Sequence, residues 1–180
     1  MWRKDDENMT DNAQDLQLRI ESRYDKRYWL DVAVSPETTL TKLDHFLRNV
    51  WLECCGHLSE FSTSGRPVRK LRPSLKVSEA FGGSKSIDYV YDFGSSTRLL
   101  IKRGKSVPAQ GDGVTLLARN KPLEHRCDEC KLPAVAICIE CSLEEDSLFC
   151  EEHEQDHECG EESLMPVVNS PRMGVCGYGG

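Results

Sequence analysis

The sequence lacks the long apolar segments that place a protein in or across a membrane. No run approaches the roughly 20 apolar residues that span a bilayer. The first ten residues are mostly charged or polar, without the apolar segment of a secretory signal. We therefore expect no membrane partner and a cytoplasmic location.

Catalytic motifs are missing as well. The three residues Asp92–Gly94 have the sequence of a kinase metal-binding motif, but neither a phosphate-binding loop nor a catalytic loop accompanies them. No other group of residues forms a known catalytic arrangement, and no small-molecule substrate site is evident. The sequence therefore predicts a protein that is not an enzyme.

The composition that remains suits a globular protein. Hydrophobic residues make up 38% of the 180 residues and charged residues 29%, which lies away from the disordered and membrane classes. This length allows one domain of roughly 100–150 residues and a smaller unit that needs further stabilisation. We predict a flexible N-terminus over residues 1–13, a domain over 14–121, a metal-binding module over 122–163 and a Gly-rich tail over 164–180.

The net charge of −7 is unevenly distributed. Residues 124–162 hold 14 acidic side chains and two basic ones, so the rest of the chain is slightly basic. Residues 66–105 hold ten basic and three acidic side chains. A run of this kind is usually a solvated surface, but it also offers a candidate nucleic-acid surface. Its candidate contacts are Arg66, Arg69, Lys70 and Arg72.

Hydrophobic periodicity predicts two strands followed by a helix. Apolar and polar residues alternate over Leu16–Ile20 and Tyr28–Val34, as in half-buried strands. From Leu40 to Cys54, apolar residues recur at intervals of three and four, which predicts a helix with one buried stripe. Cys54 lies on that stripe and Cys55 beside it, so we interpret both as small buried thiols that fill core space.

Four further segments read as strands and one as a single helical turn. The strands are expected over His57–Ser62, Ile87–Phe93, Arg98–Arg103 and Gly113–Arg119, and the turn over Val77–Phe81. The sum is a small mixed sheet of about five strands with one packed helix, which belongs to the α+β class.

Four motifs in the first domain carry a family resemblance. Together, Tyr28–Val32, Thr39–Arg48, His57–Phe61 and Tyr89–Gly94 resemble the family named after the third open reading frame of an Agrobacterium Ri plasmid. Its members are often labelled TnpR-like passenger proteins of insertion elements. The resemblance covers roughly residues 14–121 and implies a compact α+β fold. It also implies an alternative function, a mobile-element accessory protein that contacts DNA through the basic run.

This chain departs from that family at three positions. After Asp-Phe-Gly the family usually continues with a spaced aspartate, tryptophan and histidine, where this chain has Ser95, Thr97 and Leu99. Any polar site that used the aspartate and the histidine is therefore missing. Serine resolvases also need a nucleophilic serine backed by arginines, and the sequence has no such arrangement.

Eight possible metal ligands lie within 33 residues near the end of the chain. Without a secretory signal, a high cysteine count indicates reduced thiolates that bind metal rather than disulfides. Eight ligands make two complete tetrahedral sets, which leaves no open position for catalysis. We therefore predict two structural zinc ions, although spacing alone does not distinguish zinc from iron. The ligands are Cys127, Cys130, Cys138, Cys141, Cys150, His153, His157 and Cys159.

The order of the ligands leaves the pairing open. In a cross-brace, Cys127, Cys130, Cys150 and His153 share one ion and the remaining four share the other. In sequential pairing, the first four cysteines share one ion. A helical turn over Glu151–His157 would instead present both histidines on one face, where they could bind the same ion. We favour the cross-brace because sequential pairing crowds the last four ligands into ten residues.

The alternating order resembles the B-box zinc finger of the first type. Two features depart from it: the eight-residue gap before Cys150 is longer than usual, and the last ligand is Cys159 where the family has histidine. Each structural zinc supplies folding free energy on the order of 10 kcal/mol, which so acidic a segment needs. Its apolar residues are few, and the expected minimal core is Val135, Ile137, Ile139, Leu148 and Phe149.

The tail is apolar, rich in glycine and nearly uncharged. One interpretation is an extended strand that packs back over the first domain or the module. The other is a docking segment in which Cys176 is an accessible thiol. Altogether the sequence predicts a non-enzymatic zinc-binding protein, an interaction or adaptor module with a protein partner.

Overall fold

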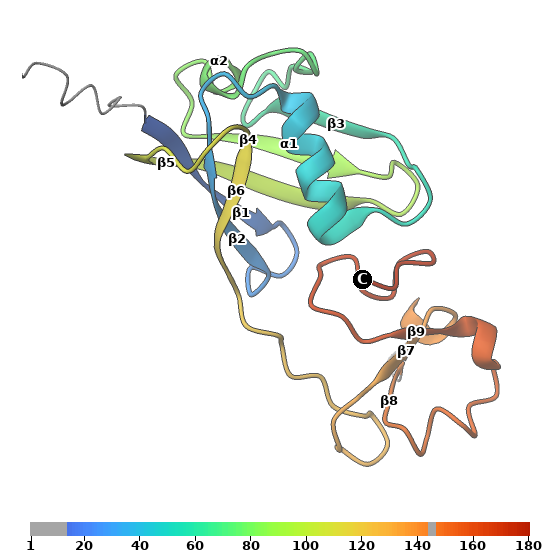
Figure 1. Cartoon of the computed structure of the whole chain (residues 1–180). Helices are drawn as coiled ribbons and strands as arrows, with labels where there is room; N and C mark the ends of the chain where they lie inside the picture. Colours follow the sequence, from blue (N-terminus) through green and yellow to red (C-terminus); the bar gives the residue numbers. More distant parts are fainter. Residues whose placement is uncertain (1–13, 144–146) are drawn as a thin grey trace, which may run out of the picture.

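Two antiparallel sheets organise the part of the chain that the computed structural model describes, residues 14–143 and 147–180 (Figure 1). The expected flexible N-terminus, residues 1–13, lies outside the described residues. The first sheet has six strands in the order β3-β4-β5-β1-β2-β6, and the second has three in the order β8-β7-β9. No helix within the described ranges is long and apolar enough to cross a membrane.

The strands of the first sheet are β1 (Gln14–Ser22), β2 (Trp29–Val34), β3 (Ser59–Thr63), β4 (Ser86–Tyr91), β5 (Thr97–Pro108) and β6 (Val114–Arg119). Those of the second are β7 (Ala136–Cys138), β8 (Leu148–Phe149) and β9 (Leu164–Pro166). The helices are α1 (Leu40–Leu47), the π-helical η1 (Arg48–Leu52) and α2 (Val77–Ala80), with 3₁₀ turns η2 (Cys141–Leu143) and η3 (Glu161–Ser163).

The α+β character is confirmed, but the mixed sheet is wrong. Every pairing in the six-stranded sheet is antiparallel. A parallel neighbour requires a crossover that returns to the adjacent position. The long connection through α1 instead carries the chain from β2 to the far edge of the sheet, where β3 pairs with β4.

The helix is shorter than the periodicity predicted. Thr39 caps its start, accepting a hydrogen bond from the backbone N–H of Lys42 at 3.4 Å, and Leu40, Leu43 and Leu47 face the core. The chain then widens into the π-helical turn η1, in which the N–H of Glu53 donates to the carbonyl of Arg48. In this way Trp51 and Leu52 reach the core, and the regular stripe ends before Cys54.

The two cysteines after this turn do not fill the core as expected. Cys54 is half-buried and packs against the core edge, whereas Cys55 is exposed. Because the helical segment ends at Leu52, both thiols lie on the irregular chain that leads to β3.

The second sheet has little apolar material to bury. Ile137 and Phe149 are buried as expected, but Ile139 and Leu148 are only half-buried and Val135 is 36% exposed. Its other buried side chains include the cysteines Cys127, Cys138 and Cys150. The apolar core of this unit is therefore smaller than the sequence indicated.

The tail packs over the first domain after β9 joins the second sheet (Figure 1). The indole N–H of Trp51 donates to the carbonyl of Asn169 at 3.2 Å, and the hydroxyl of Ser170 donates to the carbonyl of Trp51 at 2.6 Å. Beyond β9 the tail consists of turns, so an extended strand is wrong for residues 167–180.

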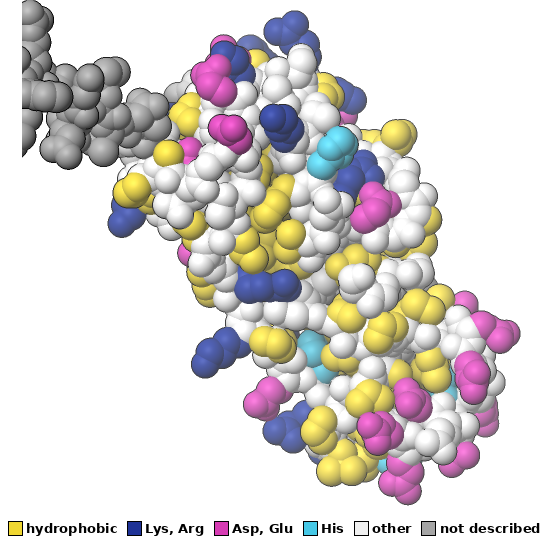
Figure 2. Space-filling view, in the orientation of Figure 1, with side chains coloured by type: hydrophobic (Ala, Val, Ile, Leu, Met, Phe, Trp, Pro, Cys, Tyr) yellow, Lys and Arg dark blue, Asp and Glu magenta, His cyan; other side chains and the backbone are white. Residues whose placement is uncertain are grey.

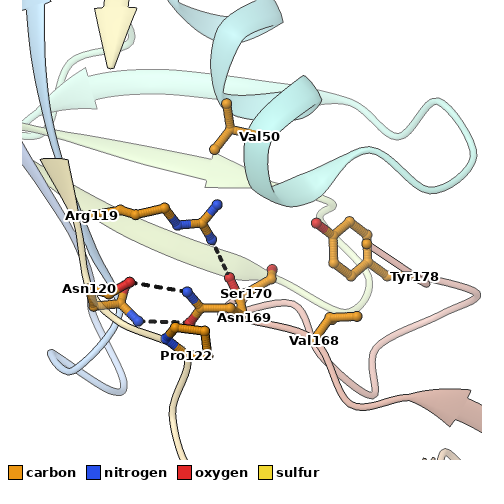
Figure 3. Close-up of a pocket in the computed structure, with 9 residues that line it drawn as sticks. Val50, Arg119, Asn120, Pro122, Val168, Asn169, Ser170 and Tyr178 are labelled. Carbon is orange, nitrogen blue, oxygen red and sulfur yellow. Dashed lines mark hydrogen bonds between the residues drawn. The ribbon is translucent and has the colours of Figure 1, made fainter. Parts of the chain in front are cut away.

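A side-chain junction joins the tail to the end of β6 (Figure 3). Asn120 donates to the side-chain oxygen of Asn169 at 2.7 Å, and Asn169 donates back to the carbonyl of Asn120 at 3.2 Å. Arg119 donates to the carbonyl of Asn169 at 2.6 Å. An open hollow of about 390 Å³ lies beside these contacts, with Val50 and Tyr178 in its lining. The end of the first domain is therefore hydrogen-bonded directly to the tail.

Candidate metal centres

The first candidate centre joins the turn before β7 to the turn after β8. Its ligand atoms, from Cys127, Cys130, Cys150 and His153, all lie within 4.8 Å of one another. The Sγ atoms of Cys130 and Cys150 are 3.6 Å apart, and His153 Nδ1 is 3.4 Å from Cys127 Sγ and 3.3 Å from Cys150 Sγ. Cys127 and Cys150 are buried, and Cys130 is exposed.

The second candidate centre joins the end of β7 to the segment before η3. It consists of Cys138, Cys141, His157 and Cys159, whose ligand atoms again lie within 4.8 Å of one another. Cys141 Sγ is 3.6 Å from His157 Nε2 and 3.7 Å from Cys159 Sγ. The two groups therefore alternate along the chain, and Cys127 and Cys130 do not share a group with Cys138 and Cys141.

These distances match tetrahedral coordination and do not match disulfides. Metal–sulfur bonds of about 2.3 Å and metal–nitrogen bonds of about 2.0–2.1 Å at tetrahedral angles separate two sulfurs by about 3.8 Å, and sulfur from nitrogen by about 3.5 Å. A disulfide would bring two sulfurs to about 2.05 Å. All nine cysteines are free. The clusters therefore suit metal binding.

The thiols within each group differ in pKa. Burial opposes ionisation of Cys127, but backbone N–H groups, led by that of Cys130, lower the pKa of its thiol to about 6. For Cys138, too, burial opposes ionisation and backbone N–H groups favour it, and the pKa of its thiol is lowered to about 7. In contrast, the neighbouring thiol of Cys159 is the main cause that raises the pKa of Cys141 to about 12. A cation shared by the group would remove this mutual repulsion.

Neighbouring side chains hold the ligands in place. The Asp128 carboxylate accepts the backbone N–H groups of Ser147 at 3.1 Å and Leu148 at 2.9 Å, which positions β8 and the cysteine after it. Glu129 lies 3.5 Å from the Nε2 atom of His153, the nitrogen that faces away from the thiols. A carboxylate there orients a ligating imidazole. The ring of Phe149 stacks on His157 with centroids 4.2 Å apart.

The expected helical turn over Glu151–His157 is wrong. The N–H of Glu154 donates to the carbonyl of Cys150, but the residues that follow form turns rather than a helix. His153 and His157 consequently point into different groups. Their spacing of four, which predicted a shared face, applies only where the helix continues.

A third group was missed by the sequence reasoning. Cys54, Cys55, His57 and Cys176 have ligand atoms within 4.8 Å of one another. The number of cysteines could have indicated it: the two predicted groups use three cysteines and one histidine each, and three of the nine cysteines remain. What was lacking was any local spacing to connect residues 54–57 with residue 176.

The remaining histidines have other surroundings. The Nε2 atom of His125 lies 3.2 Å from the hydroxyl of Tyr28, which ties residue 125 to the first domain, and burial lowers the pKa of the imidazole. His45 is exposed on α1.

The candidate nucleic-acid contacts share one loop, between β3 and α2. Arg66, Arg69, Lys70 and Arg72 are all exposed there. Lys70 forms an ion pair with Glu60 at 2.7 Å. Elsewhere in the basic run, Lys76 pairs with Glu37 and Lys102 with Glu21. Part of the positive charge is therefore offset within the first domain.

The positions where the chain departs from the Ri-plasmid pattern contact the tail or the core. Leu99 is fully buried. The carbonyl of Ser95 and the hydroxyl of Thr97 each accept a hydrogen bond at 3.1 Å from the guanidinium of Arg172. Arg172 of the tail thus contacts two of these three positions.

Comparison with known structures bears on the fold alone. The crystal structure of a protein of unknown function from Methanosarcina mazei Go1 is similar to this chain, with a TM-score of 0.52 and 19% identity, over 59% of this chain and 69% of that one. No family model matches the chain, and no curated protein matches it significantly. The resemblances to the Ri-plasmid family and to the B-box stay predictions.

Proposed function

We propose that residues 122–163 form a cross-braced, non-catalytic two-zinc module that presents an acidic surface to a protein partner. The observation that carries the proposal is the grouping of eight ligands into two sets of three cysteines and one histidine. Each set completes a tetrahedron with protein atoms, so neither ion keeps the open position that a catalytic zinc needs. The ions are structural.

Zinc suits these sets better than the harder divalent cations. Thiolate and imidazole ligands favour soft or borderline metals, whereas magnesium and calcium take oxygen ligands. The thin core around Ile137 and Phe149 supports a structural role, because it leaves the segment dependent on metal for its folding free energy. The alternating order of ligands supports the B-box-like cross-brace.

The surface of the module is strongly acidic. Figure 2 shows acidic side chains gathered on the lobe where Figure 1 draws the second sheet. A field of one sign steers a partner of the opposite sign and sets the salt dependence of association. We therefore expect a basic protein segment as the partner. Among the residues of the module that the structure describes, the exposed acidic ones are Glu124, Glu129, Glu140, Glu151, Glu152, Asp156, Glu158, Glu161 and Glu162.

The test compares partner capture by the zinc-loaded full chain and two charge-reversal variants. In the first variant, Glu151→Lys and Glu152→Lys reverse two exposed charges on the module. In the matched control, Glu79→Lys and Glu37→Lys reverse two exposed charges on the first domain. A partner of the module is lost with the first variant, retained with the control and released by salt. Equal capture by both variants contradicts the proposed surface.

The alternative function is DNA contact through the loop between β3 and α2. It is supported by the exposure of Arg66, Arg69, Lys70 and Arg72 in one loop. An electrophoretic shift at low salt should then vanish when Arg69, Lys70 and Arg72 are neutralised, with a salt slope that falls with each lost phosphate contact. No shift at low salt removes this alternative.

A further inference from the structure

The third cluster joins two separate parts of the chain, the connection between η1 and β3 and the tail. Cys54 and Cys55 follow η1, His57 precedes β3, and Cys176 lies in the tail. The tail reaches this point because it packs beside the end of the helical segment, where Figure 1 draws it. Its cysteine is separated from Cys55 by 121 positions in the sequence.

The geometry of the cluster matches that of the two others. Cys55 Sγ lies 3.7 Å from Cys54 Sγ and 3.6 Å from Cys176 Sγ, against about 3.8 Å for the edge of a tetrahedron of metal-bound sulfurs. His57 Nε2 lies 3.0 Å from Cys55 Sγ, so the imidazole need move only about 0.5 Å to reach the ideal sulfur–nitrogen separation.

The composition of the cluster is the second argument. The nine cysteines of the chain divide into three groups of three, and each group contains one histidine. No cysteine is left over. Thiols that merely filled core space would not need a histidine beside them, and Cys55 and Cys176 are exposed rather than packed in the core.

Charged neighbours suit a metal bound by three thiolates. Such a site with a divalent cation carries one net negative charge. The guanidinium of Arg172, fully buried, lies 3.5 Å from Cys54 Sγ and 2.8 Å from the carboxylate of Asp92. That carboxylate is 3.6 Å from His57 Nε2. A positive charge therefore lies directly against the sulfur that is most deeply placed.

We propose that Cys54, Cys55, His57 and Cys176 bind a third zinc ion, which fastens the tail to the first domain. Four protein ligands close the site, so the ion is structural. Bound in this way, the metal closes a loop that contains the whole of the two-zinc module, and restricting so long a loop limits the unfolded chain. The site holds the module against the first domain rather than folding the module itself.

A disulfide between Cys55 and Cys176 is the competing use of these thiols. It would need an oxidant and would draw the two sulfurs from 3.6 Å to about 2.05 Å. It would also leave Cys54 and His57 without a role. The two uses give different results in a metal count.

The decisive measurement is the number of zinc ions in the intact full chain, purified with reductant and counted by native mass spectrometry and elemental analysis. The wild-type chain should hold three ions. Cys176→Ser and His57→Gln should each reduce the number to two, and His45→Gln, the matched control on α1, should leave three. Two ions in the wild-type chain, or three in Cys176→Ser, would overturn the third site.

The same count separates this proposal from the two-zinc module. Cys127→Ser with Cys150→Ser should unfold residues 122–163 and so remove both ions of the module, while the third ion stays bound and Cys176 stays protected from alkylation. Fewer than two ions in the wild-type chain would contradict the module, whereas two ions would contradict the third site alone.

A second measurement does not depend on the folding of a variant. In the zinc-loaded wild-type chain, Cys176 should resist alkylation although its residue is exposed, and hydrogen exchange over residues 167–180 should be slower than in Cys176→Ser by at least about tenfold. Rapid alkylation of Cys176 at full zinc loading, or equal exchange in the two chains, would contradict the fastening role.

Discussion

Arg172 is the residue through which the tail reaches deepest into the first domain. Its side chain is fully buried, forms an ion pair with Asp92 at 2.8 Å and lies over the ring of Tyr91. The backbone of Asp92 has a φ of 63°, a conformation that few residues other than glycine, asparagine and aspartate adopt readily. The first domain thus keeps a buried carboxylate whose counter-charge arrives from the tail.

We predict that Arg172→Met destabilises the zinc-loaded protein by about 3 kcal/mol, because it leaves the Asp92 carboxylate buried without its guanidinium counter-charge. Urea unfolding measures the loss. Combining Arg172→Met with Asp92→Asn should recover part of it, and the exposed Arg98→Met should cost little. Additive effects of the two substitutions would show that the ion pair is not energetically coupled.

The buried hydroxyl of Tyr89 makes the stability of the first domain depend on pH. Burial, followed by the charge of Asp44, raises the pKa of its hydroxyl, which donates to the Asp44 carboxylate at 2.7 Å. A pKa raised in the folded state stabilises the protein fully below the unfolded value of about 10, and this stability is lost as pH rises above it.

Tyr89→Phe should therefore cost about 2 kcal/mol at pH 8, where it removes a hydrogen bond to a charged group. The difference in unfolding free energy from wild type should shrink as the pH rises from ~10 to ~11.5, because only the wild-type chain must keep this hydroxyl neutral in the folded state. Unfolding curves at these pH values measure it, with the exposed Tyr24→Phe as control. A constant difference across the range would refute this account.

At the scale of elements, the tail contacts the second sheet as closely as the first domain. Gly174 has a φ of 72°, and a Cβ atom built there would lie 2.7 Å from Cδ1 of Ile137 in β7. Only glycine fits this approach without displacing the Ile137 side chain. The tail is therefore fitted to the module as well as to the domain it covers.

Gly174→Ala should destabilise the protein by about 2 kcal/mol, from backbone strain and from overpacking together. Adding Ile137→Val removes the nearest carbon and should recover part of the loss. Gly177→Ala is the matched control, because no atom lies within 4 Å of its Cβ position. Equal effects of the two glycine substitutions would argue against a close approach at Gly174. Chemical denaturation measures all four chains.

Local patterns predicted the elements well and their ends poorly. Alternation identified β1 and β2, since one face of each strand lies on the core. Periodicity did not reveal the π-helical turn at Arg48–Leu52, because the apolar residues continue at helical intervals through it. The two expected ligand sets lie within 33 residues, so spacing alone constrained them. The third set depends on where the tail runs, which no local pattern encodes.

At the scale of the whole molecule, two units differ in what holds them together. The six-stranded sheet has a large apolar core beneath α1, which includes Leu18, Ile20 and Trp51. The three-stranded unit buries only a few apolar side chains. The apolar core accounts for folding of the first unit, and we assign folding of the second to its ligands.

Chelation of zinc from the full chain should unfold residues 122–163 while the first sheet stays folded. Two-dimensional NMR measures this as collapse of the amide shifts of the module, with protected amides remaining in β1, β2 and β5. The reason is that only the module relies on metal for its folding free energy. Native shifts in residues 122–163 after complete zinc removal would contradict the structural role of the ions. Zinc added back should restore the shifts.

The burial of Arg172 also sets an order of events during synthesis. Residues 169–178, which complete the surroundings of Asp92 and the end of the helical segment, leave the ribosome about 50 residues after β6. Until then the Asp92 carboxylate of the nascent first domain lacks the guanidinium that pairs with it. The first domain can therefore reach its final structure only after the module and the tail, which follow it in the sequence, have been synthesised.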